Sequence, residues 1–131
     1  MTKLSISRRL LVGILGLTWA LFSFPVFADH YPLTVSDSVG QQTFIKKPQR
    51  VVALQWDLLE NVVGLGITPV GAADIASWAT WVREPLLPDG IVDVGTRAEP
   101  NLERIAALKP DLILSGPTQL NLKKSLERFS T

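Results

Sequence analysis

The sequence predicts an α/β fold in which a parallel sheet is flanked by helices. Two observations predict this class. From residue 50 onward, short apolar runs of strand type alternate with helical patterns, and the connections between them are very short. Strands that alternate with helices pair in parallel, because each helix carries the chain back to the edge where the previous strand began.

A β-hairpin is expected before the sheet. Residues 33–45 contain two strand-like runs on either side of a turn that includes Gly40, and Lys-Lys-Pro at 46–48 then interrupts the pattern. We assign residues 29–49 to this hairpin and a linker, and residues 50–131 to an α/β lobe.

The first strand of the lobe and its helix have clear boundary signals. Residues 50–54 form a β-branched run suited to a strand that is buried on both faces. After it, Asp57 has the position of an N-cap residue, Glu60 completes a capping box, and Gly66 is placed to end the helix. Residues 67–72 then return as a second strand, so this stretch predicts a strand–helix–strand unit.

The later segments continue this alternation. Residues 73–90 show no sustained period of either kind, so we expect a long irregular loop, and such loops are often functional. Residues 91–95 predict a third strand, residues 102–108 a helix capped by Asn101, and residues 112–114 a fourth strand.

The last predicted helix covers residues 121–129, where Leu122, Leu126 and Phe129 share one face. No strand follows this helix to complete the sheet. We therefore expect the chain to be an incomplete amino-terminal lobe.

The first 28 residues have the pattern of an export signal. Lys3, Arg8 and Arg9 precede an uncharged apolar run that ends at Ala28. We expect cleavage after Ala28 and a periplasmic protein, with an uncleaved membrane anchor as the alternative. The Arg8-Arg9 pair also fits a twin-arginine signal, so the residues leave the export route open.

The composition argues against several classes of function. After removal of residues 1–28, ten basic residues stand against twelve acidic ones, and a net charge of −2 gives no basis for binding nucleic acid. The absence of cysteine excludes disulfides and a lipid-modified cysteine. His30 is the single histidine, so we expect no metal site built from protein ligands. A metal would have to arrive inside a ligand that already satisfies its coordination.

We predict no catalytic residue and no cofactor. The glycines near residue 66 close a helix instead of opening a phosphate-binding loop. Ser77 and Ser115 have only His30 as a candidate activating base. Four carboxylates are available for acid–base chemistry but fit turn and helix-start positions equally well: Asp89, Asp93, Glu99 and Glu103.

Aromatic and cationic residues follow the predicted strand ends, where open parallel sheets bind ligands. Trp56 follows the first strand of the lobe, Arg97 follows the third, and Trp78 and Trp81 lie in the long loop. Indole faces suit the apolar periphery of a bulky chelate, and a guanidinium can bridge two adjacent oxygens. Each residue also has an ordinary explanation, because tryptophans often only pack and loop arginines often only form ion pairs.

Four motifs carry a family resemblance. They are Trp-Val-Arg-Glu-Pro at 81–85, Asp-Val-Gly-Thr-Arg-Ala-Glu-Pro-Asn at 93–101, Pro-Asn-Leu-Glu at 100–103 and Leu-Lys-Pro-Asp at 108–111. The last two resemble the periplasmic siderophore-binding proteins of ABC importers as a class. The first two resemble the ferric hydroxamate-binding branch of that class. The resemblance covers roughly residues 50–114.

The resemblance implies two α/β lobes joined by a long rigid helix, with the ligand in a shallow cleft between them. Arg97 would hydrogen-bond the hydroxamate oxygens of an iron(III) siderophore, and Trp56 and Trp81 would line the pocket. Glu103 would dock the protein on the membrane permease, or would be only a carboxylate that the helix dipole favours. We expect a monomer that captures and delivers its ligand without chemistry.

Differences from the family pattern leave alternatives open. The loop after the fourth strand has no tyrosine, so Thr118 or Gln119 would substitute for it, or the ligand differs. The sequence also lacks the connecting helix and the second lobe, so this chain alone should bind weakly. The alternatives are a cobalamin or haem carrier of the same fold, an exported α/β enzyme and an inactive truncated fragment.

Overall fold

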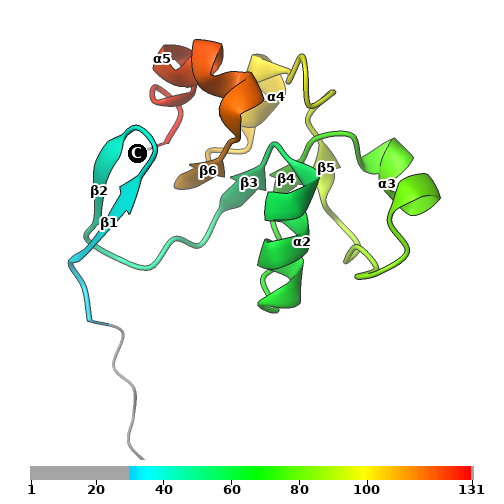
Figure 1. The fold of residues 1–131 in the computed structure, drawn as a ribbon, viewed down its shortest axis with the longest axis horizontal. Coiled ribbons are helices and arrows are strands. Elements are labelled where there is room, and N and C mark those ends of the chain that lie inside the picture. Colours follow the sequence, from blue (N-terminus) through cyan, green and yellow to red (C-terminus); the bar gives the residue numbers. More distant parts are fainter. Residues whose placement is uncertain (1–29, 131) are drawn as a thin grey trace, which may run out of the picture. The chain divides into compact units, whose positions relative to one another are not determined.

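The computed structural model describes residues 30–130, and the part from Tyr31 onward forms one compact unit (Figure 1). The predicted signal peptide at residues 1–28, with its cleavage site and twin-arginine motif, lies outside the described residues. None of the helices between residues 30 and 130 has the length and apolar character that crossing a bilayer requires.

The described part begins with the predicted hairpin. Strands β1 (Leu33–Asp37) and β2 (Gly40–Phe44) pair antiparallel, with Thr34 opposite Thr43 and their hydroxyl oxygens 2.9 Å apart. Gly40 follows the turn with a φ of 138°, a conformation that residues with a Cβ rarely adopt. The hairpin and its glycine turn are therefore confirmed.

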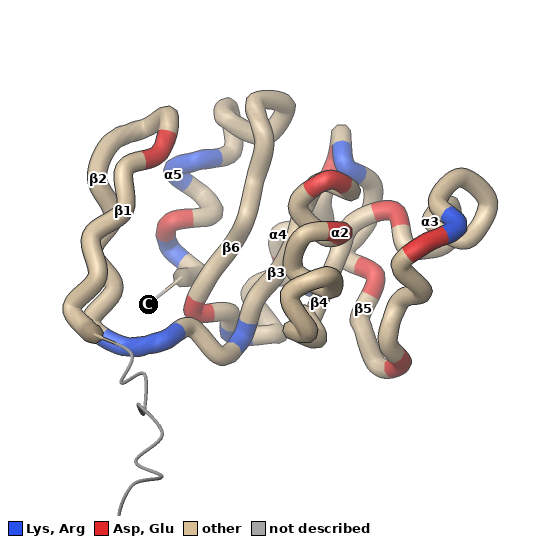
Figure 2. Tube along the Cα trace, turned by 60° about the horizontal axis from the view of Figure 1, so that its bottom comes forward, with Lys and Arg blue, Asp and Glu red and all other residues tan. Residues whose placement is uncertain are grey.

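Four strands form the predicted parallel sheet. They are β3 (Val51–Ala53), β4 (Gly71–Ala72), β5 (Val92–Asp93) and β6 (Leu112–Leu114). The order across the sheet is β5-β4-β3-β6, and every pairing is parallel. Figure 2 shows the four strands side by side in this order.

One face of the sheet is covered by α4 (Leu102–Ala107) and α5 (Lys123–Leu126). Val52 of β3 packs there with Ile105 of α4 and Leu126 of α5, and each of these side chains is buried. Burial of these apolar side chains is the main source of stability for this layer.

The opposite face is covered by α2 (Trp56–Gly64) and α3 (Ile75–Trp81). Ala53, the next residue along β3, packs there with Leu59 and Trp78. Successive side chains of a strand point to opposite faces, so β3 contributes to both cores and is buried along its whole length. This arrangement confirms a parallel sheet flanked by helices.

Helix α2 begins earlier than the sequence predicts. Its N-cap is Gln55, whose carbonyl accepts a hydrogen bond from the Leu59 N–H at 2.9 Å, and no side chain caps it. The predicted capping box of Asp57 and Glu60 is wrong, because Asp57 already lies in the first turn, where the helix dipole favours its charge. The predicted end is confirmed, since Gly66 has a φ of 77° just after the helix.

Two further helical segments differ from the prediction. The stretch 73–90 is not wholly irregular, because α3 occupies its first half. A 3₁₀ helix, η2 (Pro117–Leu122), precedes α5, so the last helical region begins before residue 121. Proline suits the first turn of a helix because the N–H it lacks would have no partner there. The predicted apolar stripe is confirmed, because its three residues all pack in the core between the sheet and the helices α4 and α5: Leu122, Leu126 and Phe129.

The Leu-Lys-Pro-Asp motif connects the starts of two neighbouring strands. The Asp111 carboxylate accepts hydrogen bonds from the backbone N–H groups of Gln49 and Arg50 at 2.8 and 2.7 Å. The Arg50 guanidinium donates in turn to the Leu108 carbonyl, with Nη2 at 2.6 Å. These bonds fix the position of β3 relative to β6 at the end of the sheet opposite the candidate site.

Candidate ligand-binding site

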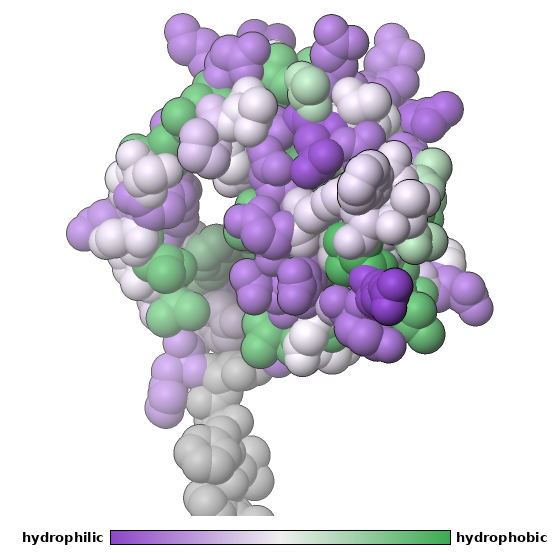
Figure 3. Space-filling view, turned by 45° about the vertical axis from the view of Figure 1, so that its right-hand side comes forward, coloured by the Kyte–Doolittle hydropathy of each residue, from purple (hydrophilic) through white to green (hydrophobic). Residues whose placement is uncertain are grey.

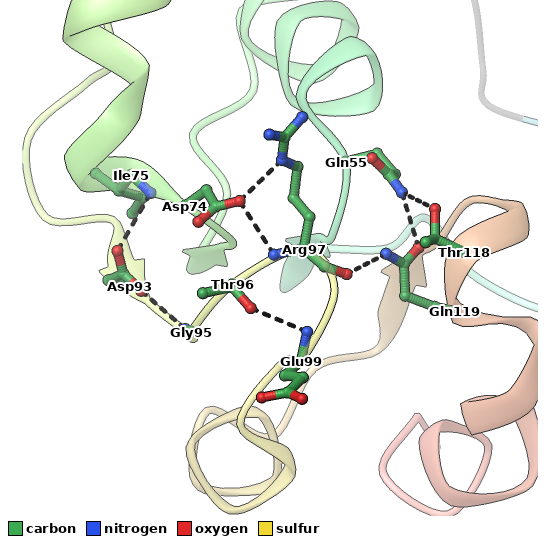
Figure 4. A network of polar contacts seen from close by, with 10 residues as sticks. All are labelled: Gln55, Asp74, Ile75, Asp93, Gly95, Thr96, Arg97, Glu99, Thr118 and Gln119. Carbon is green, nitrogen blue, oxygen red and sulfur yellow. Dashed lines mark hydrogen bonds and ion pairs between the residues drawn. The ribbon is translucent and has the colours of Figure 1, made fainter.

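The candidate site lies where the loops after β3, β4, β5 and β6 meet (Figure 4). Gln55, Asp74 and Arg97 come from the first three of these segments, and Gln119 lies in η2, the 3₁₀ helix of the segment after β6. The carboxyl ends of parallel strands lie at one edge of a sheet, which is why Gln55 and Gln119 are in contact although 64 positions separate them.

Arg97 is the central cation of the site. Its Nε donates to Asp74 Oδ2 at 2.8 Å, and its backbone N–H donates to the same oxygen at 3.1 Å. The guanidinium carbon lies 3.9 Å from the centre of the Trp56 ring, within cation–π range. Neither terminal amino group makes a hydrogen bond to any described residue, and Figure 4 shows both pointing away from the network. With 41% of the side chain exposed, two parallel donors are available to a ligand.

Trp78 packs against Trp56 from the core. The two rings meet edge to face, with centroids 5.9 Å apart and planes at 80°. Trp78 is only 3% exposed and donates its indole N–H to the Pro85 carbonyl at 3.2 Å. Its ring is therefore part of the core and has almost no surface that a ligand could contact, so the ligand contact predicted for Trp78 stays a prediction. Trp56, the first residue of α2, is partly exposed and its indole N–H is buried without a partner among the described residues.

Trp81 is separate from this cluster. It ends α3 with 75% of its surface exposed. No hydrogen bond or ring contact joins it to Trp56 or Arg97 within the described part of the chain. The structure thus brings together Trp56 and Arg97 of the predicted site and does not bring Trp81 to them.

Asp74 holds Arg97 from the loop after β4. Its own backbone is in the left-handed region with a φ of 57°, and its N–H donates to the Gly95 carbonyl at 2.8 Å. The hydrogen bond from the Arg97 side chain holds the pKa of Asp74 below its ordinary value, although partial burial acts in the opposite direction. The sequence contains no local signal for this ion pair, because Asp74 lies 23 positions from Arg97.

The 93–101 motif is the scaffold of the Arg97 loop. Asp93 accepts hydrogen bonds from the N–H groups of Gly95 at 2.8 Å and Ile75 at 3.2 Å. Gly95 has a φ of 97°, and a Cβ there would lie 3.0 Å from the Asn101 backbone nitrogen. Asn101 then caps α4 by accepting from the Arg104 N–H at 2.9 Å, as predicted. Asp93 therefore has a structural role in this turn.

Gln119 connects the loop after β6 to Arg97. Its side chain is fully buried and donates to the Arg97 carbonyl, while its oxygen accepts from the Gly116 N–H at 2.9 Å. Gln119 therefore does not substitute as a ligand-binding residue, since it has no exposed surface. Thr118, beside it, is exposed and accepts a hydrogen bond from Gln55 Nε2 at 2.8 Å. The Pro117-to-Gln119 spacing is a helix-start signal that could have indicated this inward orientation.

Glu103 lies in the first turn of α4 and is exposed. It forms no hydrogen bond or ion pair with the residues that the structure describes. Its carboxylate is therefore accessible to a partner.

The site offers groups for binding and no metal centre of its own. Across residues 30–130, no three His, Cys, Asp or Glu side chains are grouped to hold a metal ion. A groove of about 560 Å³ lies elsewhere, between the hairpin and β6, and Figure 3 shows the hollow there. Apolar residues such as Val35, Phe44 and Leu112 line that groove, which includes none of the predicted site residues.

Comparison with known proteins gives consistent matches. A family model described as periplasmic binding protein matches residues 51–130. The iron(3+)-hydroxamate-binding protein FhuD of Escherichia coli is 48% identical over 67 residues, which cover 51% of this chain and 23% of that protein. The Fe(3+) dicitrate-binding periplasmic protein FecB of Escherichia coli is 40% identical over 97 residues, covering 72% of this chain and 32% of that protein.

A solved structure agrees with these relatives. The siderophore-binding protein FhuD of Vibrio cholerae, crystallised with Fe³⁺–Desferal, matches with a TM-score of 0.61 and 54% identity. The match covers 63% of this chain and 31% of that protein. The chain therefore spans about a quarter to a third of the length of the proteins it matches. All three are named as binding proteins.

Proposed function

Since the chain belongs to the periplasmic binding protein family, we propose that it is part of a substrate-binding protein that captures an iron(III)–siderophore complex for an ABC importer. Family membership confirms the resemblance seen in the motifs. The proposal involves capture and delivery and no enzymatic step, in keeping with relatives that are binding proteins.

The guanidinium of Arg97 is the observation that supports this proposal best. Its central carbon lies 3.9 Å from the centre of the Trp56 ring, its Nε is hydrogen-bonded to Asp74, and its two terminal amino groups make no hydrogen bond to the described residues. A siderophore that encloses its iron exposes electron-rich oxygens and an apolar periphery. Parallel N–H donors suit adjacent oxygens, and an indole face suits the periphery.

We propose a hydroxamate as the siderophore type. The Asp-Val-Gly-Thr-Arg-Ala-Glu-Pro-Asn motif, which builds the Arg97 loop, supports this choice, as does the likeness to a protein crystallised with Fe³⁺–Desferal. A ferric citrate complex is the second candidate, because the relative FecB is named for it and carboxylates suit the same guanidinium. Cobalamin and haem are the comparison ligands for the test.

We propose the periplasm as the location, reached through the signal peptide at residues 1–28. The relatives FhuD and FecB support this, the latter being named as periplasmic. Glu103 is the proposed contact with the membrane permease, because it is exposed and without a partner among the described residues.

Paramagnetic line broadening tests the proposal even if binding is weak. Fe³⁺–Desferal is added to the isotope-labelled chain, with the diamagnetic Ga³⁺ complex as the matched control. We expect the iron complex, and not the gallium complex, to broaden the NMR signals of Trp56 and Arg97 selectively. Arg97→Ala should lower the affinity at least about tenfold, the loss expected when charged hydrogen bonds disappear. Arg128→Ala removes an exposed arginine in the turn after α5 and should leave affinity unchanged.

Other outcomes would contradict specific parts of the proposal. Broadening by ferric dicitrate alone would replace the hydroxamate with a carboxylate siderophore. Binding of haem or cobalamin, with no response to either iron complex, would reject siderophore capture. Unchanged affinity in Arg97→Ala would remove Arg97 from the site.

A further inference from the structure

We propose that Gln119 is the positioning residue for Arg97: its buried amide holds the Arg97 loop so that the guanidinium faces the ligand. This inference rests on the proposed function and deepens it. Gln119 has no exposed surface, so any effect it has on ligand binding must pass through the residues it holds.

The hydrogen bonds of Gln119 reach three loops at once. Its Nε2 donates to the Arg97 carbonyl in the loop after β5. Its Oε1 accepts from the Gly116 N–H at 2.9 Å in the loop after β6, and from Gln55 Nε2 at 3.2 Å in the loop after β3. Both ends of the amide are therefore used, and neither can be replaced by water in a fully buried position.

Arg97 is consequently held at opposite ends. Asp74 accepts from the backbone N–H and from Nε, while Gln119 donates to the backbone carbonyl of the same residue. Figure 4 shows Arg97 between these two partners, with its terminal amino groups directed away from both. An arginine fixed in this way loses less conformational freedom when it binds a ligand, so affinity gains from the preorganisation.

The same amide also connects Arg97 to Trp56. Gln55, the neighbour of Trp56 in sequence, packs against Gly116 so closely that a Cβ there would lie 2.9 Å from Gln55 Cγ. The buried Gln119 side chain therefore connects two parts of the site. One is the segment of Gln55 and Trp56, whose ring contacts the guanidinium, and the other is the loop that contains Arg97. Loss of the Gln119 amide should release the arginine from its place over the ring.

Gln119→Glu tests this proposal through pH. The introduced carboxylate still accepts from Gly116 and Gln55, but it repels the Arg97 carbonyl at pH 8. Burial favours the neutral form of a carboxyl group, so we expect the introduced acid to be protonated at pH 5, where it can donate to that carbonyl again. We expect the ¹³C-detected guanidinium signals of Arg97 in the full, ligand-free chain to differ from wild type at pH 8 and to return at pH 5.

Ligand affinity should follow the same pattern. We expect Gln119→Glu to bind Fe³⁺–Desferal about tenfold more weakly than wild type at pH 8, the size of one lost hydrogen bond, and with nearly wild-type affinity at pH 5. The charged side chains of the surrounding segments include Asp74, Asp93, Arg97 and Glu99, and Asp57 in the first turn of α2. They are present in both proteins, so the wild-type titration is the baseline for their effects.

Two further variants separate positioning from general destabilisation. Gln119→Met keeps the volume of the side chain without its hydrogen bonds, and should displace the Arg97 signals at both pH values. Leu126→Val weakens the core on the α4 and α5 side and should leave those signals in place. If Gln119→Glu does not fold at pH 8, Gln119→Met gives the decisive measurement.

The results distinguish this inference from the proposed function. Wild-type Arg97 signals in both Gln119 variants would overturn the positioning role, whatever the ligand result. Displaced and pH-restored signals without any binding of Fe³⁺–Desferal by wild type would support the positioning role and count against the ligand.

Discussion

At the scale of single residues, Arg97 is held in place by its neighbours, and its two terminal amino groups make no hydrogen bond to the described residues. Asp74 accepts a hydrogen bond from its Nε, and Gln119 donates one to its backbone carbonyl. The Trp56 ring makes a cation–π contact with its guanidinium. Lysine could not replace it, because an ammonium group has no planar fork that can hold a carboxylate at Nε and also present two parallel donors. The chemistry of the site therefore depends on the guanidinium itself.

The charge of Asp74 should stabilise the fold only above acidic pH. Its folded-state pKa lies below the ordinary value of about 3.9, so the stabilisation is present above that value and is lost as pH falls through the folded pKa. Asp74→Asn tests this with little change in backbone strain, since asparagine tolerates the left-handed conformation. Urea unfolding should show a loss of up to about 1 kcal/mol at pH 7, as for partly exposed ion pairs, and a smaller loss as the pH falls below the ordinary pKa of an aspartate.

Asp89→Asn is the matched control for this measurement, because Asp89 is exposed and has no hydrogen bond to the described residues. It should show no comparable dependence on pH. An Asp74→Asn difference that stays constant from pH 7 to pH 2 would mean that the charge is not the stabilising feature.

At the scale of elements, short strands need contacts outside their own ladders. Strands β3 and β6 have three residues each, and β4 and β5 have two. Asp111 adds two hydrogen bonds to the backbone just before β3 and so determines where that strand starts. The Leu-Lys-Pro-Asp motif is explained by this role.

Asp111→Asn should therefore destabilise the sheet. An amide can accept one of the two hydrogen bonds but turns a donor toward the other N–H group. We expect the free energy of unfolding in urea to fall by about 0.5–1.5 kcal/mol, the range for one hydrogen bond lost from a solvent-exposed position. A loss below about 0.5 kcal/mol, the level typical of surface substitutions, would show that water replaces the carboxylate.

At the scale of the whole molecule, the two helix layers carry different proposed tasks. The layer of α2 and α3 contributes Trp56 and its support Trp78, whereas the layer of α4 and α5 contributes Glu103. Ligand binding and permease docking would then use different surfaces of one rigid sheet. Changes to one should leave the other intact.

Glu103→Lys tests this separation in cells. We expect uptake of Fe³⁺–Desferal to fall severely, because a reversed charge opposes the proposed partner across a charged contact. Purified protein should bind Fe³⁺–Desferal as wild type does. Glu60→Lys changes another exposed glutamate, on the other helix layer, and should leave uptake unchanged. Normal uptake by Glu103→Lys would remove this residue from the docking surface.

Much of the fold was predictable because its signals are local. The β-branched run of β3, the glycine after α2 and the asparagine cap of α4 each act within a few residues of the chain. The start of α2 was mispredicted for the opposite reason. The Gln55 side chain donates hydrogen bonds to Thr118 and Gln119 and does not cap the helix. The N-cap position of Gln55 therefore cannot be recognised from the neighbouring residues.

The sequence alone determined the strand–helix order, the parallel sheet, and the placement of Trp56 and Arg97 after strand ends. These features depend on hydrophobic periodicity and turn residues, which can be recognised from residues close together in the chain. Only the tertiary structure decided that Trp78 is buried and that Trp81 lies apart from Trp56 and Arg97. It also decided that Asp74 and Gln119 form hydrogen bonds with Arg97. The two contacts that hold Arg97 join residues 22 and 23 positions apart, and sequence periodicity contains no information about such pairs.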